Sequence, residues 1–247
     1  MKKVIYLNKK EGETPLEALE SFCAKNKKYK DVKMTYAGRL DPMASGVLLV
    51  LTGEETKNKE KYLSLDKEYY FEVLFGFATD TYDILGKVLK NQKLEITEHK
   101  LKKEIKNNLK YFIGKFIQEY PIYSSKTVNG MPLFSYARSN TKVKIPNREV
   151  EVKNIKFIKI RKIDNKKLLH NIEKRIQKVN GDFRQKEILN IWYKKLKRES
   201  NFLVASFEIK CSSGTYIRGI SDLLGKKMKI PALAFSIKRT KIGRYVI

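Results

Sequence analysis

Cysteine, histidine and acidic residues are all scarce in this chain of 247 residues. The two cysteines, Cys23 and Cys211, and the two histidines, His99 and His170, lack the spacing of metal ligands or of a disulfide framework. No apolar run approaches the roughly 18 residues of a membrane span. The apolar stretch near the N-terminus is too short for a signal peptide. We therefore expect a soluble, cytoplasmic protein that binds no metal ion and no membrane.

The shortage of acidic residues leaves a large excess of positive charge. Lys and Arg number 53 against 27 Asp and Glu, which gives a formal net charge of +26 at pH 7. Forming a core does not require this imbalance, and self-repulsion disfavours the compact state. The commonest reason for such an excess is a polyanionic partner such as nucleic acid. A lysine-rich proteome, as an AT-rich genome would encode, is an alternative that the charge alone leaves open.

Hydrophobic periodicity predicts both strands and helices. Apolar and polar residues alternate over 67–77 and 201–211, as in half-buried strands. Thr14, followed by Pro15 and Glu17, is typical of a capped helix start. The elements do not follow a regular βαβ rhythm, which favours the α+β class with a mixed, largely antiparallel central sheet flanked by helices. We expect a single domain over 1–247, with further strands at 4–7 and 47–51, helices at 97–112 and 216–228, and a loop at 34–46.

Residues 161–198 are unusually basic, with 13 Lys or Arg against four Asp or Glu. Apolar residues at helical spacing fall into two stripes, over 168–179 and 188–196, on either side of a turn at 180–182. This pattern predicts a basic helical hairpin inserted in the domain. We interpret it either as an arm that contacts nucleic acid or as a solvated, lysine-rich excursion.

One acidic residue lies in an unusual setting. Residues 36–48 read YAGRLDPMASGVL, so Asp41 stands between Gly38 and Gly46, and Pro42 restricts the backbone directly after it. In a basic protein that binds nucleic acid, a carboxylate at this position cannot serve phosphate affinity, because it would repel the phosphate backbone. Asp41 is therefore either an Asx-type turn residue or a catalytic group.

This segment resembles the catalytic loop G-H-x-G-x-L-D-P-x-A-x-G-x-L of the TruB family of tRNA pseudouridine synthases. Further blocks resemble those of the family in the same order along the chain. They are GEETK at 53–57, GFATDTYDILG at 76–86, PIYSS at 121–125 with YAR at 136–138, and CSSGTYIR at 211–218 followed by DLLG at 222–225. The resemblance therefore spans nearly the whole chain outside 161–198.

The chain departs from the family pattern at several positions. Tyr36 replaces a histidine associated with opening the RNA loop, although an aromatic ring can still stack on bases. Thr127 stands at a family lysine, with Lys126 one place earlier, and KKEG at 9–12 replaces K-P-x-G. Most members continue into a C-terminal PUA-type RNA-binding domain, which we expect to be absent because this sequence stops at Ile247.

The resemblance implies catalytic roles for three residues. Asp41 matches the nucleophilic aspartate, which attacks either the uracil ring or the anomeric carbon of the ribose. Arg218 matches the arginine that holds this carboxylate in a two-point fork, whereas on its own it also fits a phosphate contact. Tyr69 matches the tyrosine that stacks on the target base, and on its own it also fits a core position. The RNA-binding residues that we infer are Tyr36, Arg39, Asp80, Lys126 and Arg138.

The implied activity is the isomerisation of uridine to pseudouridine at position 55, in the TΨC loop of tRNA. The target base must be flipped out of its structured loop before the reaction. No redox change occurs, so we expect no cofactor, and a monomer that binds the T-stem and loop. Two alternatives stay open: a tRNA-folding chaperone that uses the same cleft without essential catalysis, and a pseudouridine synthase with a different RNA target.

Overall fold

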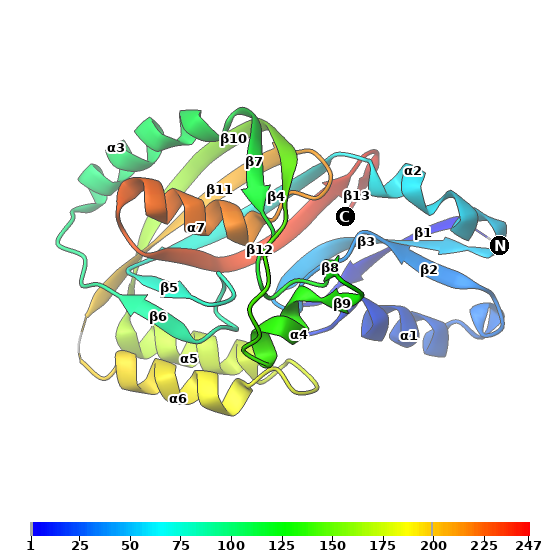
Figure 1. The fold of residues 1–247 in the computed structure, drawn as a ribbon, viewed down its shortest axis with the longest axis horizontal. Coiled ribbons are helices and arrows are strands. Elements are labelled where there is room, and N and C mark those ends of the chain that lie inside the picture. Colours follow the sequence, from blue (N-terminus) through cyan, green and yellow to red (C-terminus); the bar gives the residue numbers. More distant parts are fainter. Residues whose placement is uncertain (1, 199) are drawn as a thin grey trace.

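A mixed sheet organises the computed structural model, which describes residues 2–198 and 200–247 (Figure 1). Its strands are β1 Val4–Lys9, β2 Met34–Ala37, β3 Ala44–Thr52, β4 Lys67–Phe75, β7 Gly114–Glu119, β10 Asn147–Asp164, β11 Asn201–Cys211, β12 Ala232–Ile242 and β13 Tyr245–Val246. They are arranged in the order β1-β3-β12-β4-β11-β10-β7, with β2 beside β3 and β13 beside β12. The pair β3–β12 is parallel and the others are antiparallel.

Helices and two small sheets complete the fold. The α-helices are α1 Pro15–Lys25, α2 Lys59–Leu63, α3 Glu98–Leu109, α4 Leu133–Arg138, α5 Asn165–Ile176, α6 Gln185–Lys195 and α7 Ile217–Met228. The small sheets pair β5 Phe77–Thr79 with β6 Val88–Asn91, and β8 Thr127–Val128 with β9 Met131–Pro132. Short 3-10 helices cover Lys27–Tyr29, Gly53–Asn58 and Lys110–Phe112. Within the described residues, no helix is long and apolar enough to cross a membrane.

Helices cover both faces of the sheet. Successive side chains of a strand point to opposite faces, so Val73 and Leu74 of β4 belong to two different clusters of buried residues. The Val73 cluster includes residues of α3 and α7, and the Leu74 cluster includes residues of α5 and α6. Figure 1 shows these two helix pairs on opposite sides of the sheet. Successive residues of β4 therefore contribute to two separate hydrophobic layers, one on each face of the sheet.

The α+β class and the mixed, largely antiparallel sheet are confirmed. The strand expected at 201–211 has those bounds, and α7 begins one residue after the expected start. The capping box also forms, with Thr14 Oγ1 accepting from Glu17 N at 3.2 Å and Glu17 Oε2 accepting from Thr14 N at 2.6 Å. The loop expected at 34–46 is shorter, because residues 34–37 satisfy their backbone groups by pairing with β3.

The helical hairpin begins four residues later than the sequence pattern suggests. Residues 161–164 are the end of β10 and pair with 201–204 of β11. Asp164 then caps α5, since its Oδ1 accepts a hydrogen bond from Lys167 N at 2.8 Å. Helices α5 and α6 therefore connect two adjacent antiparallel strands and fold back onto one face of the sheet.

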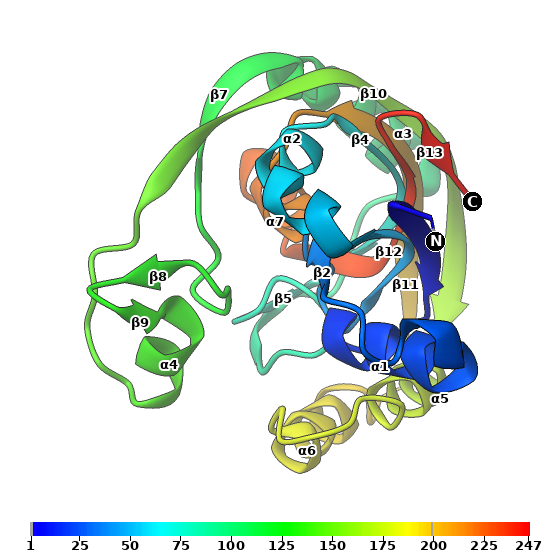
Figure 2. The same ribbon diagram turned by 90° about the vertical axis from the view of Figure 1, so that its right-hand side faces the viewer.

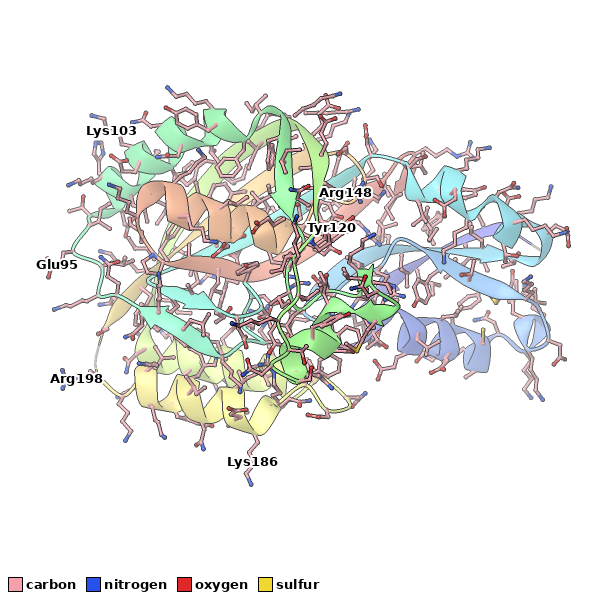
Figure 3. All side chains as sticks on the ribbon, in the orientation of Figure 1. Glu95, Lys103, Tyr120, Arg148, Lys186 and Arg198 are labelled. Atoms are coloured by element: carbon pink, nitrogen blue, oxygen red, sulfur yellow. The ribbon has the colours of Figure 1, made fainter. Side chains whose placement is uncertain are left out.

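The hairpin is part of the core and not a freely projecting arm. Trp192 of α6 is fully buried, its ring centroid lies 5.0 Å from that of Phe77, and its Nε1 donates to the Ile84 carbonyl at 3.2 Å. Lysines occupy the outer surface instead, and Lys186 of α6 points away from the molecule (Figure 3). The apolar residues of both helices therefore pack against the sheet, while their lysines face the solvent.

A small lobe lies between β7 and β10 in the sequence. It consists of the β8–β9 pair and α4, and it stands away from the main sheet (Figure 2). The lobe returns toward the hairpin through Arg138 at the end of α4, which hydrogen-bonds the carbonyl of Asp182. The lobe and the hairpin therefore meet at this contact.

Candidate active site

Asp41 lies in the turn between β2 and β3, and a buried arginine holds this turn from within. Gly38 has φ of +85°, a conformation that favours glycine. The guanidinium of Arg239, on β12, donates to the carbonyls of Gly38 at 3.2 Å, Arg39 at 3.1 Å and Val47 at 2.8 Å. These bonds fix both sides of the turn, so the position of Asp41 is set by the strand packed beside it.

The Asp41 carboxylate is paired with Arg218, near the start of α7. The Nε of Arg218 donates to Asp41 Oδ2 at 2.7 Å and its Nη2 to Oδ1 at 3.4 Å. Two further donors are also used, with Nη1 bonding the Thr81 carbonyl at 2.8 Å and Nη2 the Tyr123 carbonyl at 2.9 Å. Two backbone carbonyls thus orient the guanidinium, and the guanidinium in turn orients the carboxylate.

A second carboxylate, Asp83, lies behind this pair in a buried position. Its Oδ1 accepts hydrogen bonds from Thr81 Oγ1 at 2.7 Å and from Leu85 N at 3.0 Å. Burial raises the pKa of Asp83 to about 6, although the nearby Arg218 cation opposes the shift. Burial lowers the pKa of Arg218, but the carboxylates of Asp41 and Asp83 outweigh it and leave this pKa above its usual value. The guanidinium therefore remains charged.

Tyr69 lies on β4 in a cleft of about 710 Å³ that Asp41 also lines. Tyr216 and Ile217, at the start of α7, contribute to the same wall. Burial raises the pKa of Tyr69 to about 12, so its phenol is protonated at neutral pH. The cleft therefore combines an aromatic ring, a phenolic proton and a fixed carboxylate.

A second cavity, of about 470 Å³, adjoins this cleft at the Asp41 turn. Of the RNA-binding residues predicted from the sequence, Tyr36 and Arg39 line both spaces, whereas Arg138 lines the second cavity alone. The carboxylate of Arg138's partner, Asp182, lies 4.0 Å from the Arg138 guanidinium. Three of the predicted residues are therefore brought around the catalytic candidates.

The other two predicted RNA-binding residues lie outside both spaces. Asp80 accepts hydrogen bonds from Arg184 at 2.7 and 3.4 Å, so its carboxylate positions an arginine of the hairpin. Lys126 is exposed, and its ammonium lies 5.5 Å from the ring centroid of Tyr120. Direct RNA contacts of Asp80 and Lys126 stay predictions.

Sequence reasoning missed Arg239 and Arg184. Arg239 lies on a largely apolar strand, and the sequence signal available for it was a charged residue within such a strand. Arg184 carries no such signal, because it is one of many basic residues in 161–198 and reaches the cavity only through the fold of the hairpin. Within the described residues, no group of three or more His, Cys, Asp or Glu is placed to hold a metal ion.

Comparison with known proteins gives consistent matches. A family model described as "TruB family pseudouridylate synthase (N terminal domain)" matches residues 25–174. The tRNA pseudouridine synthase B of Ligilactobacillus salivarius is 32% identical over 219 residues, which is 89% of this chain and 61% of that protein. The protein of the same name from Lactobacillus acidophilus is 35% identical over 207 residues, covering 84% and 58%. The chain therefore spans about 60% of the length of these relatives.

Solved structures show the same fold at lower sequence identity. A chain of a Cbf5-Nop10-Gar1 complex superposes with a TM-score of 0.57 at 20% identity, covering 98% of this chain and 49% of that one. A chain of an H/ACA RNP bound to a substrate RNA containing 2′-deoxyuridine gives 0.56 at 18% identity, covering 98% and 48%. The architecture is the pseudouridine synthase fold, and the family match over more than half of its residues shows that the chain belongs to the TruB family of pseudouridylate synthases.

Proposed function

We propose that this protein isomerises uridine to pseudouridine in tRNA, at position 55 of the TΨC loop, with Asp41 as the nucleophile. The observation that carries the proposal is the Asp41–Arg218 fork, which presents a carboxylate in a cleft lined by Tyr69. The relatives named tRNA pseudouridine synthase B support tRNA as the substrate. The protein acts as a cytoplasmic monomer and uses no cofactor.

The reaction breaks the bond between C1′ of the ribose and N1 of uracil and forms a bond between C1′ and C5. N1 gains a proton and C5 loses one, so the reaction needs neither an oxidant nor a reductant. The detached or rotating base must stay bound between these two events. A covalent bond to Asp41, formed at the uracil ring or at C1′, retains the intermediate and divides the rearrangement into two easier steps.

Arg218 and Tyr69 support this step in different ways. The fork from Arg218 restricts the Asp41 carboxylate to one orientation, which reduces the reorganisation needed for attack. In this proposal the Tyr69 ring stacks on the uracil, and its protonated phenol exchanges a proton with the base during isomerisation. In this proposal a single cleft binds the uracil, orients the Asp41 carboxylate and supplies a proton.

Positive charge offsets the cost of extracting the target base. Flipping a nucleotide costs a few kcal/mol of lost stacking and pairing. A net charge of +26 provides many possible contacts with RNA phosphates. If six to ten phosphates are contacted, RNA affinity falls about 10³- to 10⁵-fold between 50 and 200 mM salt.

The test is to map pseudouridine in unmodified tRNA before and after incubation with the purified protein. We expect a new pseudouridine at position 55. The Asp41→Asn variant should form none, yet should bind tRNA within a few-fold of wild type because the loop and the cleft are retained. Asp31→Asn is the matched control, since Asp31 is an exposed aspartate outside both cavities.

Each result has a distinct meaning. Product at another position would show a different RNA target. Tight binding without any product would favour a tRNA-folding chaperone. Substantial turnover by Asp41→Asn would remove Asp41 from its proposed role.

A further inference from the structure

The turn after β1, residues 10–13, contacts both the Asp41 turn and the hairpin. Gly12 N donates to the carbonyl of Pro42 at 2.9 Å, so the turn after β1 holds the residue directly after Asp41. The Gly12 backbone has φ of +97° and passes close to the end of α5, since a Cβ on Gly12 would lie 2.6 Å from the Cβ of Lys178. The turn after β1 is therefore packed between the Asp41 turn and the hairpin.

Arg175 of α5 ties the turn after β1 to the hairpin by a charged fork. Its Nε donates to Glu11 Oε1 at 2.9 Å and its Nη2 to Glu11 Oε2 at 2.7 Å. Its Nη1 bonds Asn171 Oδ1 at 3.2 Å, and its guanidinium lies 5.0 Å from the centroid of the Phe235 ring. The side chain of Arg175 is 10% exposed and that of Glu11 is 21% exposed. Because the pair is two-pronged and shielded from water, it restrains the turn more firmly than an exposed ion pair would.

Internal hydrogen bonds stiffen the turn after β1. The ammonium of Lys9 is fully buried and donates to the carbonyls of Lys10 at 2.9 Å and Glu13 at 2.5 Å. Lys10 N in turn donates to Glu13 Oε2 at 3.0 Å. These bonds close the turn on either side of Glu11 and Gly12. A displacement of Glu11 therefore also displaces the Gly12 N–H.

A hydrophobic contact links the Asp41 turn to the hairpin in parallel. Met43 follows Pro42 in the chain and is 3% exposed. It belongs to the same buried cluster as Ile176 of α5. The two ends of the Asp41 turn are held instead by Arg239 of β12. The Asp41 turn is therefore supported by β12 at its ends and by the hairpin beside Pro42.

We propose that Glu11 and Arg175 are positioning residues for the Asp41 carboxylate, which makes the hairpin a structural support of the active site. The inference rests on the proposed function, in which Asp41 is the nucleophile. Neither residue lines either cavity, and both act through the bond from Gly12 to Pro42. Misplacing a reacting group by about 1 Å can lower a rate by about 10²-fold. Loosening this support should therefore slow the chemical step and leave RNA affinity intact.

The experiment measures single-turnover tritium release from a T-arm RNA hairpin labelled at C5 of the target uridine. Increasing the protein concentration gives an apparent affinity and a maximal rate. Glu11→Gln removes the negative charge, and Arg175→Lys keeps the positive charge but loses the fork. We expect Glu11→Gln to lower the maximal rate by about 10- to 10²-fold at unchanged affinity, and Arg175→Lys to act in the same direction. The double variant should lose no more than the slower single variant, because both changes remove one restraint.

Glu72→Gln is the matched control. Arg161 forms a comparable fork to Glu72, with distances of 3.1, 3.2 and 3.3 Å, and its guanidinium lies 5.6 Å from the centroid of the same Phe235 ring. This second pair joins β10 to β4, and neither of its residues lines a cavity. Glu72→Gln should therefore lower the stability measured by urea unfolding while leaving the maximal rate unchanged.

Amide hydrogen exchange gives a readout that does not depend on activity. The Gly12 N–H is bonded to the Pro42 carbonyl. The Ala44 N–H is bonded to the Asp41 carbonyl at 3.0 Å. Exchange at these two amides reports local opening of the turns. Both should exchange faster in the Glu11 variant than in wild type, and at the wild-type rate in the control.

The possible failures are distinguishable. Each rate is measured at a temperature at which circular dichroism shows the variant folded, and Arg175→Lys alone decides if Glu11→Gln does not fold. Unchanged maximal rates would overturn the proposed support, as would a loss of affinity alone. Equal losses in the Glu11 variant and the control would also overturn it. If the wild-type protein releases no tritium, the proposed function fails, and the exchange rates still decide whether the hairpin supports the Asp41 turn.

Discussion

Arg218 Nε lies 2.7 Å from Asp41 Oδ2, although the two residues are 177 positions apart in the chain. The side chain of Arg218 is 3% exposed, whereas that of Asp41 is 36% exposed. The cation is therefore enclosed by the protein and the anion faces the cleft. This arrangement is inconsistent with Arg218 as a direct phosphate contact, and it suits a carboxylate aimed at a substrate.

Replacing Arg218 by lysine should reduce activity far more than conservation of charge suggests. One ammonium cannot replace a fork to Asp41 together with bonds to the carbonyls of Thr81 and Tyr123. We expect the single-turnover rate to fall by about 10²-fold or more, as for other losses of a positioned charge. Arg244→Lys, at an exposed position, is the control. A rate for Arg218→Lys near that of wild type would show that the fork is dispensable.

Two substitutions of Tyr69 should separate stacking from proton transfer. Tyr69→Phe keeps the ring, so RNA affinity should be retained while the single-turnover rate falls by about 10²- to 10⁴-fold. Tyr69→Leu should lose affinity as well, because one stacking contact is worth ~1–3 kcal/mol. Tyr70→Phe is the control, because Tyr70 lies next along β4 and its side chain points to the other face. Full activity of Tyr69→Phe would eliminate the phenolic proton from the mechanism.

Asp83 should make stability depend on pH in the opposite sense to a salt-bridged carboxylate. Its pKa rises from 3.8 to about 6 on folding, so the folded protein binds the proton more tightly. The resulting stabilisation is fully present below pH ~4 and is lost as the pH rises through about 6. Asp83→Asn should therefore gain up to ~3 kcal/mol relative to wild type between pH 4 and pH 7.

Urea unfolding of both proteins across this pH range provides the measurement for Asp83. The amide oxygen of the variant can still accept the bonds from Thr81 and Leu85, so local geometry is preserved. Asp31→Asn serves again as the surface control and should show no such pH trend. A constant difference between Asp83→Asn and wild type would contradict the raised pKa.

Trp192 tests whether the hairpin belongs to the core. Its ring is fully buried against Phe77 and its Nε1 is bonded to the Ile84 carbonyl. Trp192→Ala should lower the free energy of unfolding by about 3–5 kcal/mol, as followed by circular dichroism in urea. Tyr193→Ala, at the exposed neighbouring position, should change it by about 0.5 kcal/mol or less. Equal effects of the two substitutions would mean that the hairpin packs loosely.

The outer lysines of the hairpin should contribute RNA affinity and not chemistry. Neutralising them should weaken binding and reduce the slope of log affinity against log salt by up to about 0.9 per lost phosphate contact. The maximal single-turnover rate should be unchanged. The variant carries Lys174→Gln, Lys186→Gln and Lys194→Gln, and the control carries Lys102→Gln, Lys103→Gln and Lys106→Gln on α3.

These lysines allow a cleaner test than removal of residues 161–198, which would shorten β10 and uncover the buried cluster around Trp192. Lys103 and Lys186 point outward from opposite sides of the molecule (Figure 3), so the two triple variants sample different surfaces. An unchanged salt slope for the hairpin variant would assign its lysines to solvation alone. Equal effects of the two variants would indicate nonspecific attraction to RNA.

The local elements followed from the sequence because their signals act over a few residues. Strict alternation predicted β11 with its observed bounds, and the Thr14–Glu17 pair predicted the start of α1. The motif around Asp41 indicated a rigid acidic turn in the same way. The two apolar stripes likewise indicated the helices of the hairpin, although the sequence pattern overlooked four residues that extend β10.

Only the tertiary structure decided which of these elements meet. Asp41, Tyr69 and Arg218 lie on a turn, a strand and a helix that are brought together by the order and register of the sheet. The same packing buries Arg239 beneath the Asp41 turn and places the hairpin tip in the second cavity. The physical reason is that such contacts depend on the burial of whole faces across the molecule, and this long-range packing leaves no short-range pattern at the residues that it joins.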